Sequence, residues 1–315
     1  MTLRRDMLAA AAKASSLLSG RTDRSVGFLR ERICAEGGFR GRGTSGDLYY
    51  TVFGLESLMA LDTEVPAEAV DTYLRRFTPR PGTGRTQQAG LDLVHLACLG
   101  RCWADLAERG GRSIDSGLSK VLLDGLAAHR SPDGGYALVE GATGGSAYAC
   151  LLALGLLQDL ASAPSDEQGL IRCVQSLQMP DGGFANAASM GVGATPATAA
   201  ALTSLHYLGC PVPEGSVEFL LSQAAPSGGF VAFPWGGGAE QGVVQPDLLS
   251  TATALHALSL SRQRLDEGLR RRCLGFVQGL WSEQGGFRGT AADPVVDCEY
   301  TYYGLLSLGH LGPRP

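Results

Sequence analysis

Carboxylate side chains recur in this chain where a strongly apolar segment is about to begin. Asp47, Asp92, Asp247 and Asp297 each stand before or at the start of such a segment, and Glu299 follows the last of them. A carboxylic acid that is partly withdrawn from water has a raised pKa and can deliver a proton to an alkene, directly or through a neighbouring Tyr or His. Aromatic faces stabilise a nearby cation by roughly 0.5 to 2 kcal/mol per ring. These residue types predict proton-initiated chemistry on an apolar substrate, or the binding of a cation.

The candidate residues form two groups by expected role. The expected catalytic residues are Asp247, Asp297, Asp92 and Tyr300. The residues expected to contact substrate are polar or aromatic neighbours of the same segments: Asp47, Tyr50, His95, Tyr148, Trp235, Glu299 and Tyr303. Most of them lie near the start of a repeated element, so we expect them around one end of a ring of such elements.

The same residues also have a structural interpretation. Aspartate is a preferred N-cap, and Asp47, Asp247 and Asp297 stand where a helix should begin. The tyrosines fit core packing, with a hydroxyl that reaches a backbone group. His206 and His256 recur near the ends of successive apolar segments and are interpreted as structural. Both interpretations of the aspartates and tyrosines stay open at this level.

A repeat of about fifty residues sets the elements that must position these side chains. A Gly-Gly-aromatic tripeptide recurs at residues 37–39, 134–136, 182–184, 228–230 and 285–287, and Pro81-Gly82-Thr83-Gly84 stands where a sixth copy is due. A fixed period of this length indicates one supersecondary unit, repeated, whose apolar face is buried by stacking on its neighbours.

Each Gly-Gly-aromatic turn separates two kinds of segment. The preceding segments carry charge on one face, as at residues 26–34, 117–128, 165–177 and 265–280. The following segments are almost entirely apolar, at residues 48–61, 91–106, 147–157, 197–208, 248–260 and 299–311. Their length and their Ala and Leu content favour helices over strands. Two concentric rings bury both kinds, so the sequence predicts an all-α (α/α)6 toroid with a central cavity. We expect one domain over residues 1–315, with an additional helix at residues 3–18.

The composition disfavours several classes of partner. The net charge is −5, 18% of the residues are charged and no basic run occurs, which argues against nucleic acid. No uninterrupted apolar segment has the length of a bilayer-spanning helix. Most of the eight cysteines fall within apolar helical patterns, as expected for reduced, buried thiols in a cytoplasmic protein.

Taken together, the turns and apolar helices resemble those of the protein prenyltransferase β-subunit and squalene/terpene cyclase superfamily, whose members fold as α/α toroids. The resemblance covers essentially the whole chain. It is strongest in the last repeat, from Gly285 through Val296 to Gly304. A fold hosts many reactions, so the resemblance implies the architecture more firmly than the chemistry.

The prenyltransferase members hold zinc with an Asp, a Cys two residues later and a His in the next repeat. Here Asp247 matches the first position, whereas Leu249 and Tyr300 occupy the other two. One carboxylate and a neutral phenol are a poor donor set for zinc, so we expect neither a metal nor another cofactor. The segments that would meet an isoprenoid diphosphate, residues 190–196 and 233–241, contain no cation.

The type II cyclase members donate a proton from an Asp-x-Asp-Asp-Thr-Ala motif. The nearest segment here, Asp247 to Ala252, keeps one carboxylate, and residues 193–199 keep none. Those cyclases usually place the site between two helical domains, whereas this sequence predicts one.

Three functions follow from these observations. The favoured one is a terpene-cyclase-like enzyme of small-molecule metabolism that cyclises an apolar isoprenoid or polyene in the central cavity after protonation by an aspartate. The second is a zinc-dependent prenyltransferase β-subunit-like protein, which would need an α-subunit partner. The third is a toroid that binds a small molecule or catalyses a non-terpenoid cyclisation.

Overall fold

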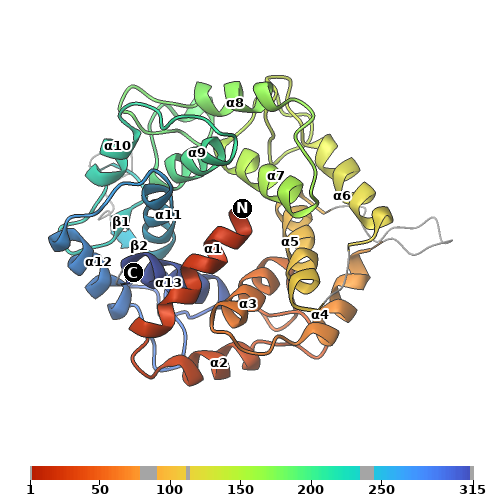
Figure 1. The fold of residues 1–315 in the computed structure, drawn as a ribbon, viewed down its shortest axis with the longest axis vertical. Helices are drawn as coiled ribbons and strands as arrows, with labels where there is room; N and C mark the ends of the chain where they lie inside the picture. The colour runs from red at the N-terminus through yellow and green to blue at the C-terminus, as the bar shows by residue number, and fades with distance from the viewer. Residues whose placement is uncertain (1, 79–90, 111–113, 235–244, 313–315) are drawn as a thin grey trace.

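The structure, a computed structural model, describes residues 2–78, 91–110, 114–234 and 245–312. Within these ranges, outer and inner helices alternate around a ring (Figure 1). The inner helices are α3 (Leu48–Ala60), α5 (Leu93–Gly110), α7 (Ala147–Asp159), α9 (Thr195–Tyr207), α11 (Leu248–Leu260) and α13 (Cys298–Leu311). The outer helices are α2 (Thr22–Glu31), α4 (Ala67–Leu74), α6 (Ser116–Ala128), α8 (Glu167–Ser176), α10 (Ser216–Ser222) and α12 (Glu267–Gly279). The predicted all-α toroid is confirmed.

Contacts between consecutive inner helices close the ring. Each inner helix packs on the next one along the chain, and α13 packs on α3. The core lies between the two layers, because the outer helices bury one face and the inner helices are buried nearly all round. This agrees with the almost entirely apolar sequences of the inner helices.

The Gly-Gly-aromatic turns hold each repeat against the next. The first glycine has a positive φ, +97° at Gly37 and +105° at Gly285, a region that favours glycine. A Cβ at Gly37 would lie 2.0 Å from the carbonyl oxygen of Ala69 in α4, and one at Gly285 would lie 2.3 Å from that of Arg24 in α2. The last turn therefore packs on the first outer helix, which closes the ring a second time.

The aromatic residue of each described turn is buried under the inner helix that follows. In four repeats its backbone N–H donates to a threonine hydroxyl one turn into that helix, as Phe39 does to Thr51 Oγ1 at 3.0 Å. In the repeat of Tyr136 the acceptor is the sulfur of Cys150, at 3.4 Å. The weaker turn expected at residues 81–84 lies outside the described residues.

Most helix boundaries lie close to the predicted ones. The segment expected at residues 26–34 forms α2 earlier in the chain, at Thr22–Glu31. The segment expected at residues 91–106 forms α5 two residues later and extends to Gly110. A pair of two-residue antiparallel strands, β1 (Phe230–Val231) and β2 (Pro246–Asp247), joins the loops before α11. Three short 3₁₀ helices are also present: η1 (Ala12–Leu17), η2 (Arg75–Phe77) and η3 (Ala188–Met190).

The additional helix lies inside the ring. It begins at Leu3 as α1 (Leu3–Ala11) and continues as η1 to Leu17. In Figure 1, α1 crosses the centre of the ring with the chain terminus near the middle, and it contacts α3, α7 and α13. A Cβ at Gly309 of α13 would lie 1.8 Å from the carbonyl oxygen of Ala10, so the two helices meet backbone to backbone. Among the described residues, no helix combines the length and apolarity needed to cross a membrane.

Candidate active site

The inner helices and α1 enclose a central cavity of about 600 Å³, a size suited to a small-molecule ligand. All six inner helices contribute to its largely apolar wall. We call the end at the amino ends of the inner helices the mouth; it includes Tyr49, Asn186 and Phe233. The opposite end, the floor, contains Arg4 and Met7 of α1. The two ends carry different polar groups.

An aromatic wall with a carboxyl group behind it lies at the mouth. Tyr49 and Phe53 of α3 pack edge to face, with ring centroids 4.9 Å apart, and Phe53 lies 5.5 Å from the ring of Tyr303. The Tyr49 hydroxyl donates to Glu299 Oε1 at 2.7 Å. Glu299 is only 9% exposed, and burial raises the pKa of its carboxyl above the usual range. Tyr49, Tyr148 and Tyr303 line the cavity, so the sequence-predicted Glu299, Tyr148 and Tyr303 come together here.

A second polar group at the mouth joins α3 to α5. Asp47 caps α3 by accepting from the backbone N–H of Tyr49 at 2.8 Å. His95 lies between two carboxylates, with Nδ1 2.8 Å from Asp92 Oδ1 and Nε2 3.9 Å from Asp47 Oδ2. The nearby carboxylates of Asp47 and Asp92 raise the pKa of His95 to about 9, so the imidazole is charged at neutral pH. The structure thus brings three predicted site residues, Asp47, Asp92 and His95, into one ion-paired group.

The two aspartates expected to be the foremost acids are helix caps set back from the cavity. Asp247 accepts from the backbone N–H and from the hydroxyl of Ser250, both at 2.7 Å. Asp297 is 1% exposed and accepts from the backbone N–H of Tyr300 at 3.0 Å. Burial raises the pKa of both carboxyls. Neither is among the described residues that line the cavity.

Three predicted aromatic residues also lie away from the cavity wall or outside the structure. The ring of Tyr50 packs on Gly41, where a Cβ would lie 2.1 Å from the ring, and Tyr300 packs in the same way on Gly289. Burial raises the pKa of Tyr300 to about 12. Trp235 lies outside the described residues. Their expected roles in substrate contact or proton relay stay predictions.

The positions that hold zinc in prenyltransferases do not fit a metal in this chain. Both carboxylate oxygens of Asp247 already accept hydrogen bonds from Ser250, Leu249 lines the cavity with an apolar side chain, and Tyr300 offers a neutral phenol. Over the described ranges, no group of three or more His, Cys, Asp and Glu side chains is placed to hold a metal ion.

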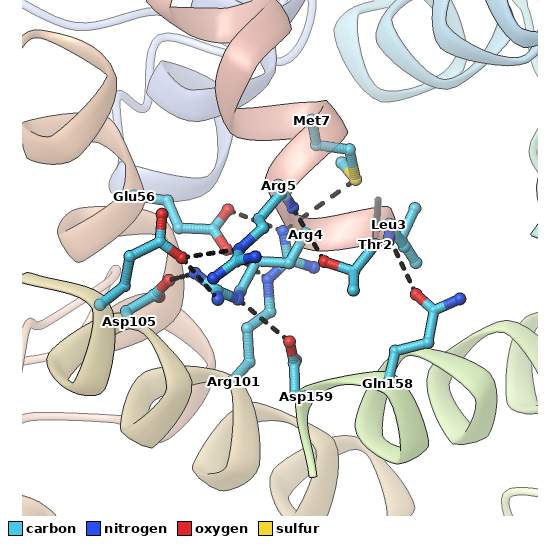
Figure 2. Close-up of polar contacts among 11 residues, drawn as sticks. Thr2, Leu3, Arg4, Arg5, Met7, Glu56, Arg101, Asp105, Gln158 and Asp159 are labelled. Carbon is cyan, nitrogen blue, oxygen red and sulfur yellow. Dashed lines mark hydrogen bonds and ion pairs between the residues drawn. The ribbon is translucent and has the colours of Figure 1, made fainter. Parts of the chain in front are cut away.

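The floor contains a buried ion-pair cluster that the sequence analysis missed (Figure 2). Arg4 of α1 reaches Asp105 Oδ1 with Nη1 at 2.8 Å, Glu108 Oε2 with Nη2 at 2.9 Å and Asp159 Oδ1 with Nε at 3.0 Å. Asp105 and Asp159 are almost fully buried, and burial raises the pKa of both carboxyls although Arg4 opposes the shift. The guanidinium therefore joins α1 to α5 and α7.

A second guanidinium stands beside this cluster. Arg101 of α5 binds Glu56 of α3 in a two-pronged contact, with Nε to Oε1 and with Nη2 to Oε2 at 2.7 Å (Figure 2). Glu56 is fully buried, whereas 22% of the Arg101 side chain remains exposed and lines the cavity. Arg101 is thus a charged group of the cavity surface, while Glu56 lies behind it.

His256 of α11 also lines the cavity, although its place in the sequence was interpreted as structural. Its Nδ1 lies 3.2 Å from Nε2 of His310. Burial, with His206 and Arg101 nearby, lowers the pKa of His256 to about 4, so the ring is neutral at neutral pH. The helical position is as expected, and the exposure to the cavity is a finding of the structure.

A signal for the floor residues was present in the sequence. Glu56, Arg101 and Asp105 are charged residues inside the otherwise apolar segments at residues 48–61 and 91–106. Charged groups are rarely buried unless paired, so each implies a partner in the interior. Arg4 offered no such signal, because it stands in a short segment of mixed polarity.

Comparisons with known proteins agree with the ring. The family model of the prenyltransferase alpha-alpha toroid domain matches residues 6–185, 143–214 and 212–312. The structure of the type II terpene cyclase MstE from Scytonema in complex with merosterolic acid A aligns with a TM-score of 0.60 at 16% identity, covering 95% of this chain and 97% of that chain. Protein geranylgeranyltransferase-I from Candida albicans, complexed with GGPP, aligns with a TM-score of 0.64 at 15% identity, covering 91% and 90%.

The fold is shared more widely than one reaction. A glycosidase structure aligns with a TM-score of 0.57 at 12% identity over 96% of both chains. Identities this low establish the fold alone. No curated protein shows significant sequence similarity to the chain. This chain covers 97% of the MstE chain, so that type II terpene cyclase structure is about the size of one such toroid, in contrast to the two helical domains usual in those cyclases.

The family matches together span nearly the whole sequence, and the solved structures share its closed ring of inner and outer helices. The chain belongs to the prenyltransferase alpha-alpha toroid domain family.

Proposed function

We propose that the protein is a terpene-cyclase-like enzyme that takes an apolar isoprenoid or polyene chain into the central cavity and cyclises it after protonation. The observation that carries this proposal is the apolar cavity of about 600 Å³ with a tyrosine–carboxyl pair, Tyr49 and Glu299, at its mouth. The likeness to MstE, whose structure is described as that of a type II terpene cyclase, supports the same class of reaction.

Glu299 is the proton source in this proposal. Burial raises the pKa of its carboxyl above the usual range, which favours the protonated form that a proton donor needs. The acid form would donate to the oxygen of Tyr49, and the Tyr49 hydroxyl would pass its own proton to an alkene carbon in the cavity. Tyr49 is the group that contacts substrate, and Glu299 restores the proton that Tyr49 gives up.

The wall supports the cation that protonation creates. Protonation of one alkene forms a carbon–hydrogen bond and leaves a carbocation, which the next double bond attacks to form a ring. The faces of Phe53, Tyr148 and Tyr303 stabilise positive charge, and the apolar wall keeps out water that would quench it. Loss of a proton from the final cation restores a double bond, so the product is an isomer of the substrate.

The acids favoured by sequence are the alternative proton donors. Asp247 and Asp297 have raised pKa values but are helix caps that do not line the cavity. Asp92 faces the opposite situation, because burial raises its pKa but the hydrogen bonds from His95 prevail and lower it, which favours the carboxylate. Geometry and pKa together favour Glu299.

Isotope incorporation tests the proposed function. The purified protein is incubated with farnesol, geranylgeraniol and squalene in light and in heavy water, and the products are analysed by gas chromatography and mass spectrometry. We expect a cyclic isomer from at least one polyene, carrying one deuterium when formed in heavy water. Recovery of all three polyenes unchanged, or a cyclic product without deuterium, would overturn proton-initiated cyclisation of this substrate class.

A further inference from the structure

Arg101 is one of three charged residues, with Arg4 and Asp159, among the described residues that line the largely apolar cavity. Its Nε and Nη2 atoms are taken up by Glu56, and Nη2 also lies 4.0 Å from the sulfur of Met7 (Figure 2). No described residue accepts a hydrogen bond from Nη1, and 22% of the side chain is exposed where Arg101 lines the cavity. A ligand in the cavity therefore meets a charged N–H donor at the floor.

A ligand that is apolar throughout would leave this donor without an acceptor. Leaving a charged N–H unpaired away from water is unfavourable, whereas a hydrogen bond to a charged group is stronger than one between neutral groups. Asp159, the carboxylate that lines the cavity at the floor, is bound by Arg4 and accepts no hydrogen bond from Arg101, which leaves the oxygen of a ligand as the acceptor in a filled cavity.

The charges of the floor decide which kind of oxygen fits. The floor contains two guanidiniums, those of Arg4 and Arg101, and three buried carboxyl groups, those of Glu56, Asp105 and Asp159. A carboxylate or diphosphate brought to Arg101 would add negative charge beside these carboxyl groups, and burial already raises the pKa of Asp105 and Asp159, so the floor disfavours further negative charge. A neutral hydroxyl or carbonyl avoids it.

We propose that the floor of the cavity binds the neutral, oxygen-bearing end of an otherwise apolar substrate, a hydroxyl or carbonyl group, through Nη1 of Arg101. This inference rests on the proposed function and names the substrate class within it. It also orients the substrate: the oxygen lies against Arg101, and the far end of the hydrocarbon chain lies at the mouth beside Tyr49 and Glu299, where protonation begins.

Binding of four probes with the same carbon skeleton tests the site: farnesol, farnesal, farnesoic acid and the hydrocarbon farnesene. Dissociation constants are measured by displacement of a fluorescent apolar dye from the intact protein. We expect farnesol and farnesal to bind about tenfold more tightly than farnesene, as one hydrogen bond to a charged donor allows. Farnesoic acid, ionised at neutral pH, should bind no better than farnesene.

Variants assign that preference to Arg101. The double variant Glu56→Gln with Arg101→Met removes the donor and its counter-charge together, so no buried charge is left unpaired. It should bind farnesene as the parent does and lose the preference for farnesol. Arg101→Lys, which keeps a cation for Glu56, should lose most of it, and this variant decides the question if the double variant fails to fold. Arg109 lies on the same helix and binds Asp62 and the Met59 carbonyl. Arg109→Met is therefore the matched control and should keep the preference.

The outcomes separate this inference from the proposed function. Equal binding of farnesol and farnesene, tightest binding of farnesoic acid, or a preference that survives in both Arg101 variants would each overturn the floor site. Selective binding that depends on Arg101, without any cyclic product in heavy water, would support the floor site and overturn the proposed cyclase activity. Cyclic products without any preference for farnesol over farnesene would keep the proposed cyclase activity and overturn the floor site.

Discussion

At the mouth of the cavity carboxylates cap helices, whereas at the floor they pair with buried guanidiniums. Asp47, Asp247 and Asp297 each accept from backbone N–H groups in the first turn of an inner helix. Asp105 and Asp159 are bound by Arg4, which comes from a different helix. The caps repeat because every repeat begins an inner helix, and the floor does not repeat because α1 is a single element. The repeated carboxylates therefore stabilise the ring, whereas the ion pairs of the floor depend on α1, which occurs once.

The largest effect should follow from removing the guanidinium at the floor. Arg4→Met leaves Asp105 and Asp159 buried without their cation, which should lower the free energy of unfolding by about 3 to 5 kcal/mol. Urea denaturation followed by circular dichroism measures this. Arg5→Met is the control, because Arg5 is exposed and its contact with Glu108 should contribute at most about 1 kcal/mol. Equal losses in the two variants would mean that the floor cluster is no more important than a surface ion pair.

At the mouth, the next largest effect should be on turnover rather than on stability. Glu299→Gln keeps an acceptor for the Tyr49 hydroxyl but cannot supply a proton, so turnover of the best polyene should fall about 100- to 10,000-fold with folding nearly unchanged. Asp247→Asn is the matched variant, and we expect it to retain turnover. Loss of turnover in Asp247→Asn with Glu299→Gln still active would transfer the acid role to the cap aspartate.

A smaller effect should distinguish a cap from an ionised group. Asp247→Ala removes the acceptor of the Ser250 N–H and should cost about 0.5 to 2 kcal/mol, whereas Asp247→Asn keeps an acceptor and should cost less. Urea midpoints of both variants give the comparison. Equal losses of stability in the two variants would show that Asp247 stabilises the fold through its charge and not through capping.

The smallest effect should be a pH dependence at the mouth. The pKa of His95 is raised to about 9, so its pairing with Asp47 and Asp92 stabilises the fold fully below the unfolded value of about 6.5 and is lost as the pH rises through 9. His95 is 35% exposed, so solvent screening limits the contribution to about 1 kcal/mol or less.

The stability difference between the parent and His95→Gln should therefore be larger at pH 6 than at pH 10, measured by urea denaturation at both values. Salt at about 1 M should shrink that difference, since these charges are partly exposed. A difference that grows with pH would contradict the ion-paired state of His95.

Much of the ring could be predicted from local signals. The segment at residues 248–260 was predicted as a helix, and α11 has the same bounds. The capping interpretation of Asp47, Asp247 and Asp297 is confirmed, because a cap depends on a side chain and a backbone group only two or three residues away. Which residues face the cavity could be predicted only in part: Tyr148 and Tyr303, two of the expected substrate contacts, line it, whereas the structure places Tyr49 there and not its neighbour Tyr50.

The sequence by itself determined the alternation of helices, the positions of the glycine turns and the caps, because each follows from periodicity or from contacts within a few residues. Only the tertiary structure decided the floor of the cavity. Arg4 pairs with Asp105 and Asp159, which lie 101 and 155 residues away along the chain. Contacts at such separations arise only when the ring closes and α1 packs across it, and no local pattern records that event.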